Sequence, residues 1–292
     1  MTTSQTKPAV IVLSSHVVRG SVGNRAVVFA LERLGFPVWA VPTVTLPWHP
    51  GHGRGTRIVP DPEQFAALTG ELERAPWLGE VGAVLSGYLG HAGQATAVSS
   101  LVAAVKAKNP EAAYMCDPVM GDAEGLYVPQ GTAEAIRDQL LPFADIATPN
   151  RYELDWLTGT VSGSNTEAAR AALSLEPSTV LVTSAHAMMA GSIGNLLVTP
   201  REVLLAEHRM LPNPPSGTRD LASALFLAHL LEGQPPEKAL QKATAAVFET
   251  VARSVKRGGD ELMLETDSDS LIHPMALVQT RRLVYPTAGN RA

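Results

Sequence analysis

Short apolar runs alternate with longer segments of helical spacing along most of this 292-residue chain. The first such run covers residues 9–13. Helical spacing follows over 23–34 and ends at Gly35, which is typical of a residue just beyond a helix C-terminus. Alternation of this kind predicts βαβ units, because each helix returns the chain to start a parallel strand. We therefore expect an α/β fold with a central, mostly parallel sheet and helices on both faces.

The later elements repeat the same alternation. We expect further strands at 37–41, 81–85, 112–116, 146–148, 180–183 and 196–198, and helices at 61–74, 94–108, 132–141, 151–157, 166–173, 221–231 and 236–254. Residues 42–60 are rich in Pro and Gly, and this predicts a long loop or irregular hairpin that could cover a site. No linker interrupts the pattern, so we expect a single domain over 1–292. Its core covers roughly 9–255, residues 42–60 form an insertion, and 260–292 form a weakly patterned tail.

Charge and cysteine usage exclude several classes of function. The net charge of −5 (23 basic minus 28 acidic residues) argues against nucleic acid as the main partner, which usually requires a basic face. Cys116 is the single cysteine, so an intramolecular disulfide and a Cys-rich zinc site are excluded, and a reducing, cytoplasmic setting is expected.

No segment has the pattern of a targeting signal or a membrane helix. Two stretches without charged residues, 81–105 and 177–200, exceed the roughly 20 residues that a membrane helix needs. Gly, Ser and Thr interrupt both stretches, so we predict buried core elements there and no membrane partner.

Polar segments follow the predicted strands, and in parallel sheets ligands bind beyond the carboxyl ends of the strands. The P-loop, the G-x-G-x-x-G fingerprint, the H-E-x-x-H motif and the G-x-S-x-G motif are all missing from the sequence. His49 and His52 lie close in sequence, but without a third ligand they do not predict a zinc site. The candidate segments are 14–16, 20–24, 86–90, 117–122, 148–153, 183–184 and 214–220.

Segment 214–220 leads directly into a predicted helix and contains Gly217. Backbone N–H groups and the positive end of the helix dipole at such a position make an anion site. Asp220 has two explanations there. It could cap the helix, or it could act as a base beside a bound phosphate and take the proton of an attacking hydroxyl.

Other candidate residues also have both a structural and a functional explanation when only their chemistry is considered. Asn150 and Glu153 have the spacing of a capping box, but the same amide and carboxylate could hold a hydrated Mg²⁺. Asp117 could form a plain turn with the proline after it, or it could mark the edge of a site. Tyr88 could stack on a ring or pack in the core, whereas Cys116 is expected to be a small core residue.

Taken together, five motifs in register resemble the pyridoxal kinases of the ribokinase-like superfamily, over roughly residues 9–255. The motifs are Ser15-His16-Val17-Val18 with Gly20 and Gly23-Asn24, Leu85-Ser86-Gly87-Tyr88-Leu89-Gly90, Cys116-Asp117-Pro118-Val119-Met120-Gly121, Thr148-Pro149-Asn150-x-x-Glu153, and Gly217-Thr218-x-Asp220. The resemblance implies a single α/β domain, a homodimer, and ATP-dependent phosphorylation of the 5′-hydroxymethyl group of pyridoxal, pyridoxine or pyridoxamine.

The resemblance also implies a role for each candidate residue. Ser15, Thr43, His49 and Tyr88 would bind the vitamin; Asp117, Thr148, Thr183 and Ser184 would contact ATP and its phosphates; Asn150 and Glu153 would organise Mg²⁺ through water, with Asp117 nearby; Gly217, Thr218 and Arg219 would form the anion hole; and Asp220 would be the base. A monovalent cation is a further cofactor that the resemblance allows.

Two departures from the family pattern keep alternatives open. The usual loop is Gly-x-Gly-Asp, and Arg219 replaces its second Gly. Arginine there could be costly if the backbone needs a positive φ, could add a cation to the phosphates, or could extend into solvent. Residues 47–52 also differ, since a Tyr is common at the place of His52. The alternatives are a related kinase for another small alcohol, such as a hydroxymethylpyrimidine, and a pyridoxal-binding protein with little catalysis.

Overall fold

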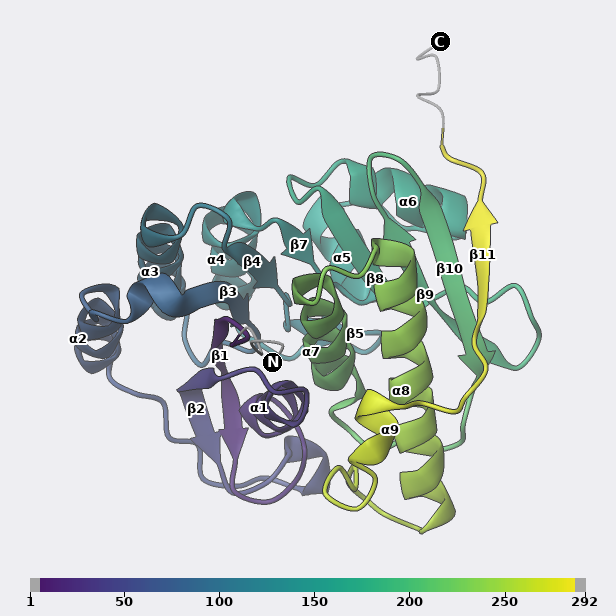
Figure 1. The fold of residues 1–292 in the computed structure, drawn as a ribbon, viewed down its shortest axis with the longest axis horizontal. Coiled ribbons are helices and arrows are strands. Elements are labelled where there is room, and N and C mark those ends of the chain that lie inside the picture. The colour runs from purple at the N-terminus through teal and green to yellow at the C-terminus, as the bar shows by residue number, and fades with distance from the viewer. Residues whose placement is uncertain (1–5, 287–292) are drawn as a thin grey trace, which may run out of the picture.

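A nine-stranded sheet forms the centre of the computed structural model, which describes residues 6–286 (Figure 1). Its strand order is β11-β10-β9-β8-β7-β4-β3-β1-β2. All neighbouring strands from β2 to β8 pair in parallel. Strands β9, β10 and β11 extend the sheet beyond β8 by antiparallel pairing. The parallel strands are β1 (Ala9–Val17), β2 (Val38–Leu46), β3 (Val81–Ser86), β4 (Ala113–Cys116), β7 (Ile146–Ala147) and β8 (Thr179–Ala185). The antiparallel strands are β9 (Ser192–Val198), β10 (Val203–Arg209) and β11 (Gln279–Leu283).

Helices cover both faces of this sheet, as the alternation in the sequence predicts. The helices are α1 (Asn24–Arg33), α2 (Pro62–Glu73), α3 (Gln94–Lys108), α4 (Gln130–Gln139), α5 (Arg151–Thr158), α6 (Asn165–Leu173), α7 (Thr218–Leu231), α8 (Pro236–Lys256) and α9 (Asp269–Ile272). In Figure 1, α1, α7 and α8 lie in front of the sheet. A small hairpin of β5 (Gly121–Asp122) and β6 (Gly125–Leu126) follows β4. The predicted α/β class is confirmed.

The side chains of β1 show why the sheet is covered on both faces. Val10 and Val12 are fully buried in the core that contains α1, α7 and α8, whereas Ile11 and Leu13 are fully buried in the core that contains α2, α3 and α4. Successive side chains of a strand point to opposite faces. A continuous apolar run is therefore required for a strand with a hydrophobic core on each side.

Strand β2, strand β10 and the tail differ from the sequence prediction, which placed no strand at Val203–Arg209, whereas the insertion agrees with the predicted irregular hairpin. Strand β2 continues to Leu46 instead of ending at residue 41, because an edge strand tolerates a proline such as Pro42. Beyond it, Thr45 and Ile58 exchange backbone hydrogen bonds of 2.8 and 3.0 Å, so the insertion is an irregular hairpin that also holds the 3₁₀ turn Pro50–His52. The tail contains α9 and β11, which are too short and too polar to give a periodic pattern.

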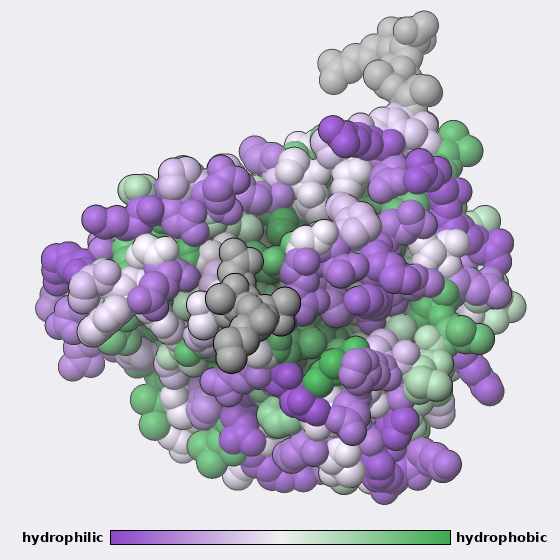
Figure 2. Space-filling view, viewed as in Figure 1, coloured by the Kyte–Doolittle hydropathy of each residue, from purple (hydrophilic) through white to green (hydrophobic). Residues whose placement is uncertain are grey.

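The apolar stretches 81–105 and 177–200 form core elements, since the first contains β3 and most of α3 and the second contains β8 and β9. Within residues 6–286, no helix combines the length and apolar character required to cross a membrane. Figure 2 shows that hydrophilic side chains dominate the face that it presents, with hydrophobic side chains in scattered groups.

Candidate active site

A cavity of about 770 Å³ lies at the carboxyl ends of the parallel strands. The predicted site residues that line it are Ser15, His49, Tyr88, Asn150, Thr183, Ser184, Gly217, Thr218, Arg219 and Asp220. The other predicted residues, Thr43, Asp117, Thr148 and Glu153, are buried and are not among the lining residues. The carboxyl-terminal parts of β1 and β8, the loops after β2, β3 and β7, and the N-terminus of α7 therefore meet where the sequence predicted a site.

Gly217 makes the turn that opens α7. Its φ is +91°, and a Cβ added there would lie 2.0 Å from the carbonyl oxygen of Ser21, so no other residue fits without a backbone shift. Gly217 is also the N-cap residue, and it provides no side-chain hydrogen bond to the first turn. The N–H groups of this turn are thus not capped by a side chain at the N-cap, as an anion site requires.

Asp220 lies in the first turn of α7, is half-buried, and lines the cavity. Burial raises the pKa of its carboxyl group, and the backbone of Gly23 and the charges of Arg219 and His49 act in the opposite direction. Because Gly217 is the N-cap, Asp220 does not occupy the capping position. A carboxylate with a raised pKa at the wall of a cavity is suited to accept a proton.

Asn150 and Glu153 form a complete capping box at the start of α5. The Glu153 N–H donates to Asn150 Oδ1 at 2.9 Å, and the Asn150 N–H donates to Glu153 Oε2 at 2.8 Å. The other carboxylate oxygen, Glu153 Oε1, accepts from the backbone N–H of Met120 at 3.0 Å. Glu153 is fully buried, and burial raises its pKa while Arg219 and these backbone donors lower it. Both oxygens of Glu153 therefore have protein partners.

Asp117 follows β4 and is 2% exposed. Its Oδ2 accepts from Ser223 Oγ at 3.0 Å, and Ser223 Oγ in turn bonds to Thr148 Oγ1 at 2.9 Å. Its Oδ1 is buried without a hydrogen-bond partner among the described residues. Burial raises the pKa of Asp117 to about 7, against the opposing charge of Arg219. Thr148 therefore reaches Asp117 through Ser223 and does not face the cavity.

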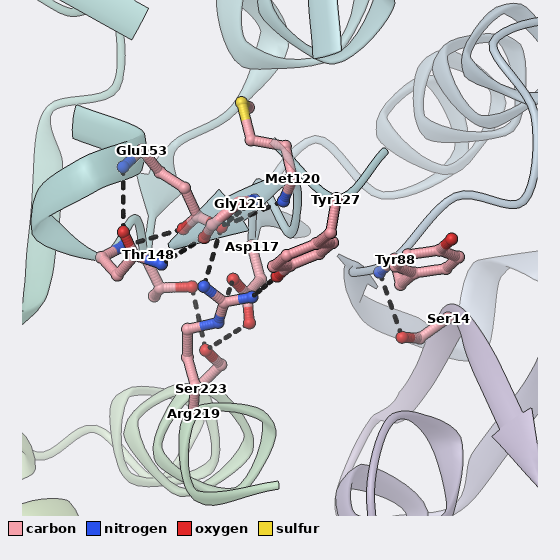
Figure 3. Close-up of polar contacts among 11 residues, drawn as sticks. Ser14, Tyr88, Asp117, Met120, Gly121, Tyr127, Thr148, Glu153, Arg219 and Ser223 are labelled. Carbon is pink, nitrogen blue, oxygen red and sulfur yellow. Dashed lines mark hydrogen bonds and ion pairs between the residues drawn. The ribbon is translucent and has the colours of Figure 1, made fainter. Parts of the chain in front are cut away.

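The Arg219 side chain turns inward, and the alternative in which it extends into solvent is wrong (Figure 3). Its Nη1 lies 2.8 Å from Glu153 Oε1, its Nη2 donates to the Tyr127 hydroxyl at 3.1 Å, and its Nε lies 3.5 Å from Asp117 Oδ1. Arg219 belongs to helix α7 and is not among the residues with positive φ. The backbone at this position therefore carries none of the left-handed strain that would exclude arginine.

The acidic groups can be tested as ligands for Mg²⁺. Among residues 6–286, no three His, Cys, Asp or Glu side chains are grouped so that they could hold a metal ion. The capping box and Arg219 occupy the oxygens of Glu153, which leaves Asp117 Oδ1 as the unpartnered carboxylate oxygen at this place. Mg²⁺ commonly binds one or two carboxylates and keeps several waters. The arrangement fits a cation held mainly by nucleotide phosphates and water.

Tyr88 lies on the opposite side of the cavity. Ser14 Oγ accepts from the Tyr88 N–H at 3.2 Å (Figure 3). In addition, Thr43 Oγ1 donates to the Tyr88 carbonyl at 2.5 Å. Thr43, which is fully buried, therefore positions Tyr88 through its backbone. Arg57 also lines the cavity, and its Nη2 donates to the Tyr88 hydroxyl at 3.4 Å and to the Gly90 carbonyl at 2.6 Å.

Residues 47–57 are joined to the rest of the site by two histidines. Ser216 Oγ lies 3.3 Å from His49 Nδ1, and His52 Nε2 lies 2.8 Å from Glu261 Oε1. Burial lowers the pKa of His49, whereas the charges of Glu261 and Asp220 raise it. Glu261 also accepts from the Ser21 N–H at 3.3 Å, so the tail takes part in the site.

Sequence reasoning missed Arg57, Tyr127, Ser223 and Glu261. Arg57 lies in the 42–60 insertion, where a basic residue beside a predicted site could have been noticed. The other three belong to no motif, and only the folded chain brings Tyr127 to Arg219, Ser223 to Asp117, and Glu261 to His52.

Comparison with known families and proteins gives concordant matches. The phosphomethylpyrimidine kinase family model matches residues 80–265. A pyridoxal kinase of Rubrobacter xylanophilus is 38% identical over 283 residues, covering 94% of this chain and 97% of its own. A pyridoxal kinase of Pseudomonas entomophila is 38% identical over 288 residues, with coverages of 95% and 99%.

The solved structures agree with these sequence relatives. Pyridoxal kinase from Leishmania donovani in complex with ADP and pyridoxamine superposes with a TM-score of 0.89 at 28% identity, over 95% of this chain and all of that one. The same protein in complex with ADP and pyridoxine gives a TM-score of 0.88. With relatives well above 30% identity over nearly the whole length, this chain belongs to the pyridoxal kinase family of the ribokinase-like superfamily and is a kinase.

Proposed function

We propose that this protein transfers the γ-phosphoryl group of ATP to the 5′-hydroxymethyl group of pyridoxal, giving pyridoxal 5′-phosphate. The observation that carries the proposal is the N-terminus of α7, where a helix N-terminus without a side-chain cap and the carboxylate of Asp220 share one cavity. The cavity volume of about 770 Å³ is within the range of known ligand sites, about 300–1,000 Å³.

Asp220 is the proposed base. Phosphoryl transfer needs little covalent help from a protein, because alignment and neutralisation of charge on the phosphoryl oxygens provide most of the rate. The N–H groups at Gly217 and Thr218 would stabilise the transferred group, together with Arg219. Thr183 and Ser184, which line the cavity from β8, are the proposed contacts for the other phosphates.

Pyridoxal is proposed to bind at the Tyr88 side of the cavity. The Tyr88 ring offers an aromatic face for the pyridine ring, held in place by Thr43 through the 2.5 Å bond to the Tyr88 carbonyl. Ser15 and His49 line the same cavity and provide polar groups for the ring substituents. Pyridoxine and pyridoxamine carry the same hydroxymethyl group and are proposed as further substrates.

Mg²⁺ is the proposed cofactor, and when bound with ATP it would neutralise phosphate charge. Asp117 would lie nearest to it through the unpartnered Oδ1, and Asp117, Asn150 and Glu153 would all act on it through water. Thr148 would support Asp117 through Ser223. A monovalent cation is a further proposed cofactor. We further propose a cytoplasmic homodimer, for which light scattering of the purified protein is the direct measurement.

An assay of the purified protein with ATP and Mg²⁺ tests the proposal. Pyridoxal and a hydroxymethylpyrimidine are compared as acceptors, with formation of each phosphate followed by chromatography. Higher kcat/KM for pyridoxal supports the proposal. Preference for the pyrimidine would favour a related kinase for that alcohol, and pyridoxal binding without turnover would favour a pyridoxal-binding protein.

A further inference from the structure

Two buried carboxylates and one guanidinium lie together (Figure 3), and the residue that carries the guanidinium, Arg219, lines the cavity. Glu153 is fully buried and Asp117 is 2% exposed. Burying a carboxylate is unfavourable unless a cation or several hydrogen bonds compensate its charge. Arg219 supplies that cation from the chain itself, with 2.8 Å between Nη1 and Glu153 Oε1 and 3.5 Å between Nε and Asp117 Oδ1.

The partners of the two carboxylates are unequal. Glu153 is paired on both oxygens, whereas Asp117 Oδ1 is buried and has no hydrogen bond among the described residues. An oxygen of this kind is a preferred ligand of divalent cations. A guanidinium already at 3.5 Å from it opposes a second cation by charge repulsion. Arg219 therefore competes with any divalent cation for these two carboxylates.

We propose that Arg219 supplies the positive charge of this site in place of a directly bound metal. Its guanidinium takes the position that a divalent cation bound directly to Asp117 and Glu153 would need. It also contributes to the binding of nucleotide phosphates when no metal is present. The inference rests on the proposed use of ATP. A guanidinium has five N–H donors. Within residues 6–286, one N–H on each Nη makes no hydrogen bond, and Arg219 lines the cavity. These donors match the geometry of a phosphate.

Thermal unfolding with Mn²⁺ and no nucleotide tests the first half of this proposal. We compare the full chain with Arg219→Met, which removes the charge but keeps the stem, and with Arg219→Lys, which keeps a cation. The Tm of R219M should rise by about 2–5 °C at a tenfold excess of Mn²⁺ over its dissociation constant. The Tm of the unmodified protein and of R219K should not change. Adding Glu153→Gln to R219M should remove the rise.

Calorimetric titration with ADP in EDTA tests the second half. R219M should bind ADP about tenfold or more weakly than the unmodified protein, since a charge-assisted contact is lost. Added Mg²⁺ should improve ADP binding by a larger factor in R219M than in the unmodified protein. If R219M does not fold, Arg219→Gln gives the same comparisons with a neutral hydrogen-bond donor in place.

Two results would overturn the proposal. Equal stabilisation of the unmodified protein and R219M by Mn²⁺ would show that the guanidinium does not exclude a divalent cation. No stabilisation of either, with unchanged ADP affinity, would show that the carboxylates offer no cation position and that Arg219 does not contact the phosphates. None of these measurements needs turnover of pyridoxal, so their failure is distinct from failure of the proposed reaction.

Discussion

Replacing Asp220 with asparagine separates its proposed role as a base from a role in the helix. The variant keeps the size and the hydrogen-bonding oxygen of the side chain but cannot accept a proton. General bases contribute about 10²–10⁴-fold to rate, so kcat should fall by that factor, which corresponds to about 3–5 kcal/mol in activation free energy. An acidic residue in the first turn of a helix contributes only about 0.3–1 kcal/mol to stability.

The stability of the D220N variant should change by less than about 1 kcal/mol, because Asp220 is not the N-cap and burial already disfavours its charged form. The affinities for ADP and pyridoxal should stay within a few fold. In the unmodified protein, kcat should rise with pH through a pKa above the ordinary aspartate range, since only the ionised carboxylate accepts the proton. The D220N variant should lack this rise.

The matched control is Asp61→Asn. Asp61 does cap a helix, since its carboxylate accepts from the Glu63 N–H at 2.9 Å at the start of α2. Both variants remove one negative charge at a helix N-terminus, so a general charge effect would alter both. Steady-state kinetics, urea unfolding and calorimetry on each variant complete the comparison. A kcat for D220N within tenfold of the unmodified value, with ligand affinity retained, would refute the role as base.

Three further predictions concern the rest of the structure. Gly217→Ala should abolish turnover and lower Tm, because the added Cβ would lie 2.0 Å from the Ser21 carbonyl oxygen. The control is Gly233→Ala, where φ is also positive (+76°) but an added Cβ has no atom within 4 Å; this variant should lower Tm less and keep turnover. Cys116 should react with thiol reagents at pH 8 only after unfolding, because burial raises its pKa to about 12. Glu249→Gln should destabilise the protein by about 2–3 kcal/mol at pH 7, measured by urea unfolding. Burial raises the pKa of Glu249, but hydrogen bonds from the Met275 N–H and Arg253, among others, lower it overall. The ionised carboxylate therefore stabilises the folded protein at pH values above the ordinary glutamate pKa, and this stabilisation is lost as the pH falls through the lowered pKa of the folded state. The difference in unfolding free energy between E249Q and the unmodified protein should therefore shrink in acid. An equal difference at pH 7 and in acid would contradict this.

The parallel strands could be predicted because each of them has a distinctive pattern within its own short segment of sequence. Each parallel strand such as β1 is buried on both faces, and this requires an uninterrupted apolar run that is visible in the sequence. Strand β11, with the sequence Gln-Thr-Arg-Arg-Leu, lies at the sheet edge and is largely exposed. Its place depends on pairing with β10, more than 70 residues earlier in sequence, so no local pattern predicts it.

The candidate site shows the same division. The residues after each strand were predictable from topology alone, since parallel strands bring their carboxyl ends to one edge. The inward turn of Arg219 was not, because it depends on Glu153 and Asp117, which lie more than 60 residues away in sequence. The sequence left three alternatives for Arg219, and the buried acidic partners exclude the solvent-exposed one.

Asn150 and Glu153 show that a capping role and a site role constrain each other. The capping box fixes Glu153 Oε2 on the Asn150 N–H, and this leaves Oε1 to face Arg219 and the backbone after β4. A carboxylate free of the helix terminus could rotate toward a metal, whereas one held by its own N-cap keeps its charge at a fixed point below the cavity. The local rule that starts α5 therefore also preorganises the electrostatics of the site. For that reason Glu153→Gln should keep the helix, since glutamine also completes a capping box, and should lose the ion pair with Arg219.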